Sequence, residues 1–173
     1  MSQPVVFRTG QTYYSWWAYF PAAFLDNLTQ GFLNIANWYE QNNLGGTAPT
    51  WSITAYPIGG GNMGLLIFRN APVYPTPHTG PDSYLTNLPI PLGSWVNFEV
   101  NYPNRLAGSN GSGPFQIWQD GNLVLDLPNQ IGVEGSSLVN LWQLQIYGNG
   151  FPNPPFLMYI DDVKISDSRI ADH

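Results

Sequence analysis

The stretch FQIWQDGNLVLDL, residues 115–127, contains an Asp-Gly step between two runs rich in apolar residues. Asp120 and Gly121 can take the positive φ values of a two-residue type I′ turn, whose twist matches that of the flanking strands. This turn predicts the cross-strand pairs Gln119–Asn122, Trp118–Leu123 and Ile117–Val124. The stretch therefore predicts an antiparallel β-hairpin.

Both faces of this hairpin carry large apolar side chains. Successive side chains of a strand point to opposite faces. The sequence therefore predicts two sets, one of Gln116, Trp118, Leu123 and Leu125 and the other of Phe115, Ile117 and Val124. A sheet solvated on one side would alternate apolar with polar residues. We therefore expect the hairpin to lie inside a sheet. Its Phe115 face should pack on an opposing sheet, and its Trp118 face should lie on a concave surface.

The rest of the chain also has the pattern of strands. Further strands are predicted over residues 11–21, 31–40, 50–58, 63–70, 93–103, 138–148 and 156–166. One short helix is predicted at 21–29, after a proline, and residues 71–84 are predicted to form a surface loop. Many short strands separated by Gly- and Pro-rich turns are typical of an all-β sandwich or barrel. The strands with two apolar faces favour a two-sheet antiparallel sandwich, formed by one domain over residues 1–173.

The composition limits the classes of partner. Charged residues make up 9% of the 173 residues and aromatic residues 15%, and the net charge is −6. Nucleic acids and anionic membrane surfaces bind clusters of Lys and Arg. This acidic chain has only five such residues, so neither is expected as a partner. No apolar run is long enough to span a bilayer, and no signal peptide is visible. The polar, uncharged and aromatic composition predicts an extracellular protein or one on a virion or cell surface.

Four stretches together resemble a known family. LGSWVNFEVNYP (92–103), GPFQIWQDGNLVLDL (113–127), YIDDVKIS (159–166) and YYSWWAYFPAAF (13–24) are similar to strands of concanavalin A-like jelly rolls. The similarity is greatest to the polysaccharide-lyase and heparin-lyase-like branch. The resemblance implies a jelly-roll β-sandwich with at most one or two short helices. It also implies a polysaccharide or other glycan as ligand.

The motifs that carry catalysis in that branch are absent from this sequence. Such lyases commonly have Gln-x-His on a strand and a C-terminal Tyr-x-Lys-x-Gly-x-Tyr stretch. Here NIANWYE (34–40) and YIDDVKIS stand in the corresponding places, and the two histidines, His78 and His173, lie outside the predicted strands. Glu40 and Glu99 could form a glycosidase pair, but nothing in their spacing enforces proximity. The sequence therefore favours a protein that is not an enzyme.

Aromatic residues are the main candidates for glycan contact, because a ring buries the C–H face of a sugar at little conformational cost while amides bind hydroxyls. The predicted carbohydrate-binding residues are Tyr14, Trp16, Trp38, Gln116, Trp118 and Trp142. Asp161 and Asp162 could offer oxygen ligands to a structural calcium ion. Alternation along the strand, however, puts the two carboxylates on opposite faces.

Three functions stay open at this point. The first is a non-catalytic carbohydrate-recognition sandwich. The second is a structural or adhesive surface protein, such as a virion decoration or fibre component or a subunit of an extracellular assembly, because uncharged apolar faces often mark contact surfaces. The third is a polysaccharide lyase or glycoside hydrolase with an atypical site.

Overall fold

The computed structural model describes residues 11–23, 32–41, 47–69, 83–103, 112–131, 140–149 and 157–170. These residues form ten β-strands. The strands are β1 (Gln11–Tyr19), β2 (Phe32–Gln41), β3 (Thr47–Gly59), β4 (Asn62–Arg69), β5 (Ser83–Leu85), β6 (Trp95–Pro103), β7 (Ser112–Gln119), β8 (Asn122–Ile131), β9 (Asn140–Asn149) and β10 (Tyr159–Ser166). No helix long and apolar enough to cross a bilayer occurs within these described ranges.

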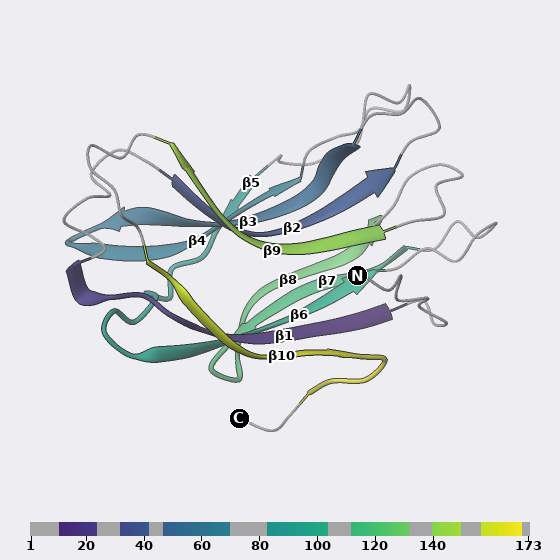
Figure 1. Ribbon diagram of the computed structural model, residues 1–173. Helices are drawn as coiled ribbons and strands as arrows, with labels where there is room; N and C mark the ends of the chain where they lie inside the picture. The colour runs from purple at the N-terminus through teal and green to yellow at the C-terminus, as the bar shows by residue number, and fades with distance from the viewer. Residues whose placement is uncertain are drawn as a thin grey trace.

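The strands form two five-stranded antiparallel sheets stacked as two layers (Figure 1). Sheet A has the order β10-β1-β6-β7-β8, and sheet B has the order β5-β4-β3-β2-β9. The predicted all-β sandwich is therefore confirmed. The chain crosses repeatedly between the layers, so that neighbouring strands such as β1 and β6 are far apart in sequence.

Aromatic rings from both sheets fill the space between the layers. Trp38 of β2 stacks on Tyr102 of β6 with ring centroids 5.2 Å apart, and Trp51 of β3 stacks on Phe115 of β7 at 4.2 Å. Tyr14 of β1 lies 4.7 Å from the ring of Trp142 on β9. Burying such large rings contributes a large apolar area between the two sheets.

The hairpin over residues 115–127 forms as predicted. Asp120 and Gly121 have φ values of 48° and 74°, as a type I′ turn requires. The Asp120 Oδ1 accepts a hydrogen bond of 2.9 Å from the backbone N–H of Asn97, and the Asp120 N–H donates to the Asn97 carbonyl at 2.9 Å. These bonds tie the turn to β6, the strand beside β7.

The register of this hairpin differs from the prediction at one point. A bulge lies between Ile117 and Trp118, so that Ile117 pairs with Leu125 rather than with Val124. Leu125 consequently packs against the core instead of sharing the Trp118 face, where Leu123 is 50% exposed. Alternation alone could not reveal this bulge, because inserting one residue reverses every later side chain.

Phe115 and Ile117 are fully buried in the core, which confirms the predicted inward face. Strand β7 is internal to sheet A, as predicted, whereas β8 forms its edge.

Two local predictions have different outcomes. Strand β5, which pairs with β4, lies partly in the segment predicted as a loop, and its three residues were too few to give a pattern. Of the helix predicted over 21–29, the structure describes residues 21–23, where Ala22 and Ala23 form a short 3-10 turn.

Candidate functional site

The outer side of sheet A, facing away from sheet B, is the candidate site. On β1 the even-numbered side chains from Tyr14 to Ala18 are fully buried against sheet B, so the odd-numbered ones point outward. Strand pairing extends this face over the neighbouring strands. The aromatic residues on it are Tyr13, Trp17, Tyr19, Trp95, Trp118 and Tyr159. This side therefore combines aromatic rings with access from solvent.

At one end of this face three rings lie in one row across three adjacent strands. Tyr19 of β1 pairs with Tyr159 of β10 on one side and with Trp95 of β6 on the other. The Tyr19 ring centroid lies 5.9 Å from that of Tyr159 and 5.7 Å from that of Trp95. Tyr159 is 51% exposed and Trp95 is 45% exposed. We call these three residues the aromatic row.

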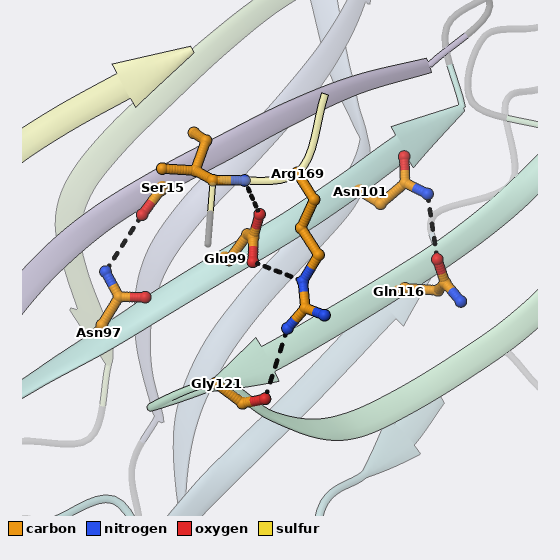
Figure 2. Close-up of polar contacts among 8 residues, drawn as sticks. Ser15, Asn97, Glu99, Asn101, Gln116, Gly121 and Arg169 are labelled. Atoms are coloured by element: carbon orange, nitrogen blue, oxygen red, sulfur yellow. Dashed lines mark hydrogen bonds and ion pairs between the residues drawn. The ribbon is translucent and has the colours of Figure 1, made fainter. Parts of the chain in front are cut away.

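A ladder of amide and carboxylate side chains crosses the other end of the face. The Asn101 Nδ2 donates to the Gln116 Oε1 at 3.1 Å (Figure 2). The Gln116 Nε2 donates in turn to the Asp126 Oδ1 at 3.0 Å. These residues come from β6, β7 and β8, which are neighbours in the sheet. The ladder fixes the orientation of these polar groups.

A buried carboxylate lies between these two regions. Glu99 of β6 is 0% exposed although it points to the outer side of the sheet, because Arg169 and Ile170 of the C-terminal segment, residues 167–170, contact it. The Ile170 backbone N–H donates to the Glu99 Oε1 at 2.6 Å, and the Arg169 Nε lies 3.3 Å from the Oε2 (Figure 2). This pairing compensates the cost of burying the charge.

Arg169 also covers the predicted glycan contact Trp118. Its guanidinium carbon lies 4.7 Å from the centroid of the Trp118 ring, and its Nη2 donates to the Gly121 carbonyl at 3.5 Å. Trp118 is consequently only 7% exposed. An aromatic face that binds a guanidinium has no room for a sugar ring, so the open part of the site is the aromatic row.

Tyr13 lies next to the Glu99 region, with its ring centroid 6.3 Å from that of Trp118. Burial, and then the negative charge of Glu99, raise the pKa of the Tyr13 hydroxyl above its ordinary value, while Arg169 opposes them. The phenol is thus neutral at physiological pH and can donate a hydrogen bond.

Three of the predicted sugar contacts are core residues. Tyr14, Trp16 and Trp38 are 0% exposed and lie between the sheets, so no face of their rings is open to a glycan. The sequence pattern could not show this, because Tyr14 and Trp16 alternate with equally aromatic neighbours. Trp142 is half-buried and packs on Tyr14 and Trp16 with centroid distances of 4.7 and 5.9 Å.

Gln116 and Trp118 lie on the outer face, as predicted, in the ladder and under Arg169 respectively. The residues that the sequence reasoning missed are Tyr19, Trp95 and Tyr159. The signal for Tyr19 was present in the odd-numbered aromatic positions of residues 13–19. Strand order was needed to place Trp95 and Tyr159 beside it.

Asp161 and Asp162 do not fit a calcium site by themselves. Calcium takes about six to eight oxygen ligands, whereas the Asp162 Oδ2 is ion-paired with the Lys164 Nζ at 2.7 Å. The Asp161 Oδ1 accepts the Asp162 N–H at 2.8 Å. No group of three or more potential ligands that could hold a metal occurs among the residues the structure describes. Calcium at this position stays a prediction from sequence.

Glu40 and Glu99 belong to different sheets. Glu40 is on β2 of sheet B, whereas Glu99 is on β6 of sheet A and points away from sheet B. Sheet A itself therefore separates the Glu99 carboxylate from the other layer. His78 and His173 lie outside the described residues.

The outer side of sheet B offers a different surface. At its centre, Asn37 of β2 and Ser52 and Thr54 of β3 are only 1–3% exposed. Its exposed Tyr56 and Tyr147 lie on β3 and β9, which β2 separates. Tyr56 and Tyr147 therefore do not form a row of adjacent rings like the aromatic row.

Solved structures of polysaccharide lyases share this jelly-roll sandwich. An endo-β-1,4-glucuronan lyase from the fungus Trichoderma reesei is similar over 93% of this chain and 70% of its own, with 18% identity and a TM-score of 0.66. An alginate lyase from Pseudomonas aeruginosa is similar over 91% of this chain and 64% of its own, with 12% identity and a TM-score of 0.57. For the alginate lyase Aly36B the shares are 95% and 72%, with 16% identity and a TM-score of 0.59.

These similarities establish the fold. The sequence itself matches no protein-family model and no curated protein.

Proposed function

We propose that this protein is a non-catalytic carbohydrate-recognition sandwich that binds a glycan on the outer side of sheet A. The observation that carries the proposal is the aromatic row, in which two of three adjacent rings are about half exposed. Tyr and Trp rings bury the apolar C–H face of a sugar and lose little side-chain entropy in doing so. Sugar hydroxyls would bind to the polar side chains that share the outer face with these rings.

The glycan-binding character of the structural neighbours supports the class of ligand. One structure of Aly36B is a complex with an alginate trisaccharide, and one of the alginate lyase AlyC3 is a complex with dimannuronate. Both of these ligands are short oligosaccharides.

Catalysis is not favoured by the described residues. Cleavage by a pair of carboxylates needs the two groups on opposite sides of one glycosidic bond. Glu99 already accepts hydrogen bonds from Arg169 and Ile170, and Glu40 belongs to the other sheet. Recognition without cleavage therefore accounts best for the outer face.

Self-assembly as a surface subunit has less support. Edge strand β10 exposes Ile160, Val163 and Ile165 by 36–50%. The same strand has a bulge, with φ of 47° at Asp162, and the Asp162–Lys164 ion pair. Bulges and charges of this kind discourage edge-to-edge pairing. Light scattering after size-exclusion chromatography tests this alternative, and a stable oligomer would revive it.

A panel of soluble polysaccharides tests the proposal. Affinity electrophoresis should show retarded migration on at least one glycan, and calorimetry should give its affinity. The same glycans should keep their length, and uronate polymers should show no rise in ultraviolet absorbance from unsaturated products. If no glycan retards the protein, the proposed function is wrong. If a bound glycan is shortened, the protein is an enzyme.

A further inference from the structure

We infer that the aromatic row binds a neutral polysaccharide, as a single chain, and that uronate polymers are not its ligands. This inference rests on the proposed function and adds the class of glycan and the place where it binds. It follows from three features of the outer face of sheet A: the reach of the row, the tilt of its rings and the partners of the cations.

The row is a continuous ridge of rings across the edge of the sheet. Tyr159, Tyr19 and Trp95 belong to the adjacent strands β10, β1 and β6, and their centroids follow one another at 5.9 and 5.7 Å. Trp17, two residues before Tyr19 on the same face, is half-buried and continues the aromatic surface along β1. An extended chain can therefore contact several rings at once.

The rings are tilted relative to one another. The planes of Tyr19 and Trp95 make an angle of 56°, and those of Tyr19 and Tyr159 make an angle of 67°. A flat crystalline polysaccharide surface can stack on several rings only when they are coplanar. Tilted rings instead suit successive sugar units that are rotated about the axis of a single chain.

The cations among the described residues do not favour binding of a uronate at the row. Recognition of a carboxylate uses Arg or Lys, best in bidentate geometry. The described residues include three such cations, and each already has a partner. Lys164 is ion-paired with Asp162, Arg169 is ion-paired with Glu99, and the Arg69 Nη1 donates to Gln130 at 3.5 Å.

Longer-range electrostatics act in the same direction. The chain has eleven acidic and five basic residues and a net charge of −6. A uronate polymer is also negatively charged, so the protein as a whole repels it. Asp161 lies on the outer face two residues from Tyr159 and pairs with Trp17. A neutral glycan has no such repulsion, and its hydroxyls can donate hydrogen bonds to carboxylates and amide oxygens.

Binding of the full chain to two sets of probes tests the inference. The neutral set is xyloglucan, galactomannan and mixed-linkage β-glucan, and the uronate set is alginate, polygalacturonate and glucuronan. We expect binding to a member of the neutral set that is nearly independent of salt, and no binding to the uronate set. The Trp95→Ala substitution should weaken neutral binding about three- to tenfold, as the loss of one stacked ring predicts. Trp95→Ala combined with Tyr159→Ala should abolish detectable binding.

Tyr147→Ala is the matched control, because Tyr147 is 58% exposed but lies on β9 of sheet B. It should leave the affinity unchanged. All variants should stay folded at the assay temperature, because the replaced rings are at least about half exposed and lie outside the core cluster. Binding to uronates as tight as to neutral glycans would overturn the inference and leave the proposed function intact. So would neutral binding that survives in the double variant. Failure of both probe sets would refute the proposed function itself.

Discussion

The contact between the C-terminal segment and Glu99 allows a quantitative test of the outer face. Glu99 is 0% exposed and accepts bonds from the Ile170 N–H at 2.6 Å and the Arg169 Nε at 3.3 Å. Arg169→Met keeps an apolar side chain at this position but removes the charge and the guanidinium contacts to Glu99 and Trp118. It leaves a buried carboxylate short of one partner, which costs about 1–3 kcal/mol of unfolding free energy.

That range is below the roughly 3–5 kcal/mol expected for a completely enclosed ion pair. The Arg169 side chain is 45% exposed, so water can replace part of its contribution. Glu99→Gln should cost about 0.5–1.5 kcal/mol, because the amide oxygen still accepts from Ile170 while the ion pair is lost. Urea denaturation followed by Trp fluorescence measures both costs and that of the double variant.

The double-mutant cycle should give a coupling energy of about 0.5–3 kcal/mol between Glu99 and Arg169. Lys164→Met is the matched control, since the Lys164–Asp162 pair is 42% and 50% exposed and should contribute about 0–1 kcal/mol. The reasoning is refuted if the costs of Glu99→Gln and Arg169→Met sum to the cost of the double variant within about 0.5 kcal/mol. The C-terminal segment would then not lie on the sheet in solution.

Three further outcomes are expected. Ile117→Ala, which removes a fully buried side chain, should cost about 2–5 kcal/mol in urea denaturation, and a cost below about 1 kcal/mol would contradict its place in the core. Gly121→Ala, at φ of 74°, should cost about 1–2 kcal/mol in the same assay, and no change would mean that the turn is not of type I′. Because the folded protein raises the pKa of Tyr13, stability should fall as the pH rises above the ordinary tyrosine value. Thermal unfolding across that alkaline range should show a smaller fall for Tyr13→Phe, and equal falls would exclude Tyr13 as the cause.

Much of the architecture was predictable because it follows from local rules. Alternating apolar residues and Gly-rich turns predicted nine of the ten strands, missing only the three-residue β5. The Asp120-Gly121 step predicted the type I′ turn, since few residue pairs tolerate positive φ twice. The two apolar faces of residues 115–127 correctly predicted a second sheet over Phe115 and Ile117.

The division of the aromatic residues between core and surface was decided only by the tertiary structure. Residues 13–19 carry rings at both odd and even positions, so period-two alternation defines two faces without saying which is inside. Contact with sheet B resolves this: Tyr14 packs on Trp142 and is buried, whereas Tyr19 faces solvent. The bulge beside Trp118 then moves Leu125 from the predicted outer face to the core side of the sheet, which the alternation of residues could not predict.

The aromatic row and the covered Glu99 depend on pairings between residues far apart in the chain. Tyr19 gains its neighbours because β1 lies between β10 and β6, and strand order is a property of the whole sandwich. Glu99 is buried because the C-terminal segment, seventy residues later, lies over it. The sequence by itself determined the strands, the turn and the acidic, aromatic composition, because these depend on neighbouring residues. The place of the site was decided by tertiary structure, because only packing selects which rings the core takes and which stay in water.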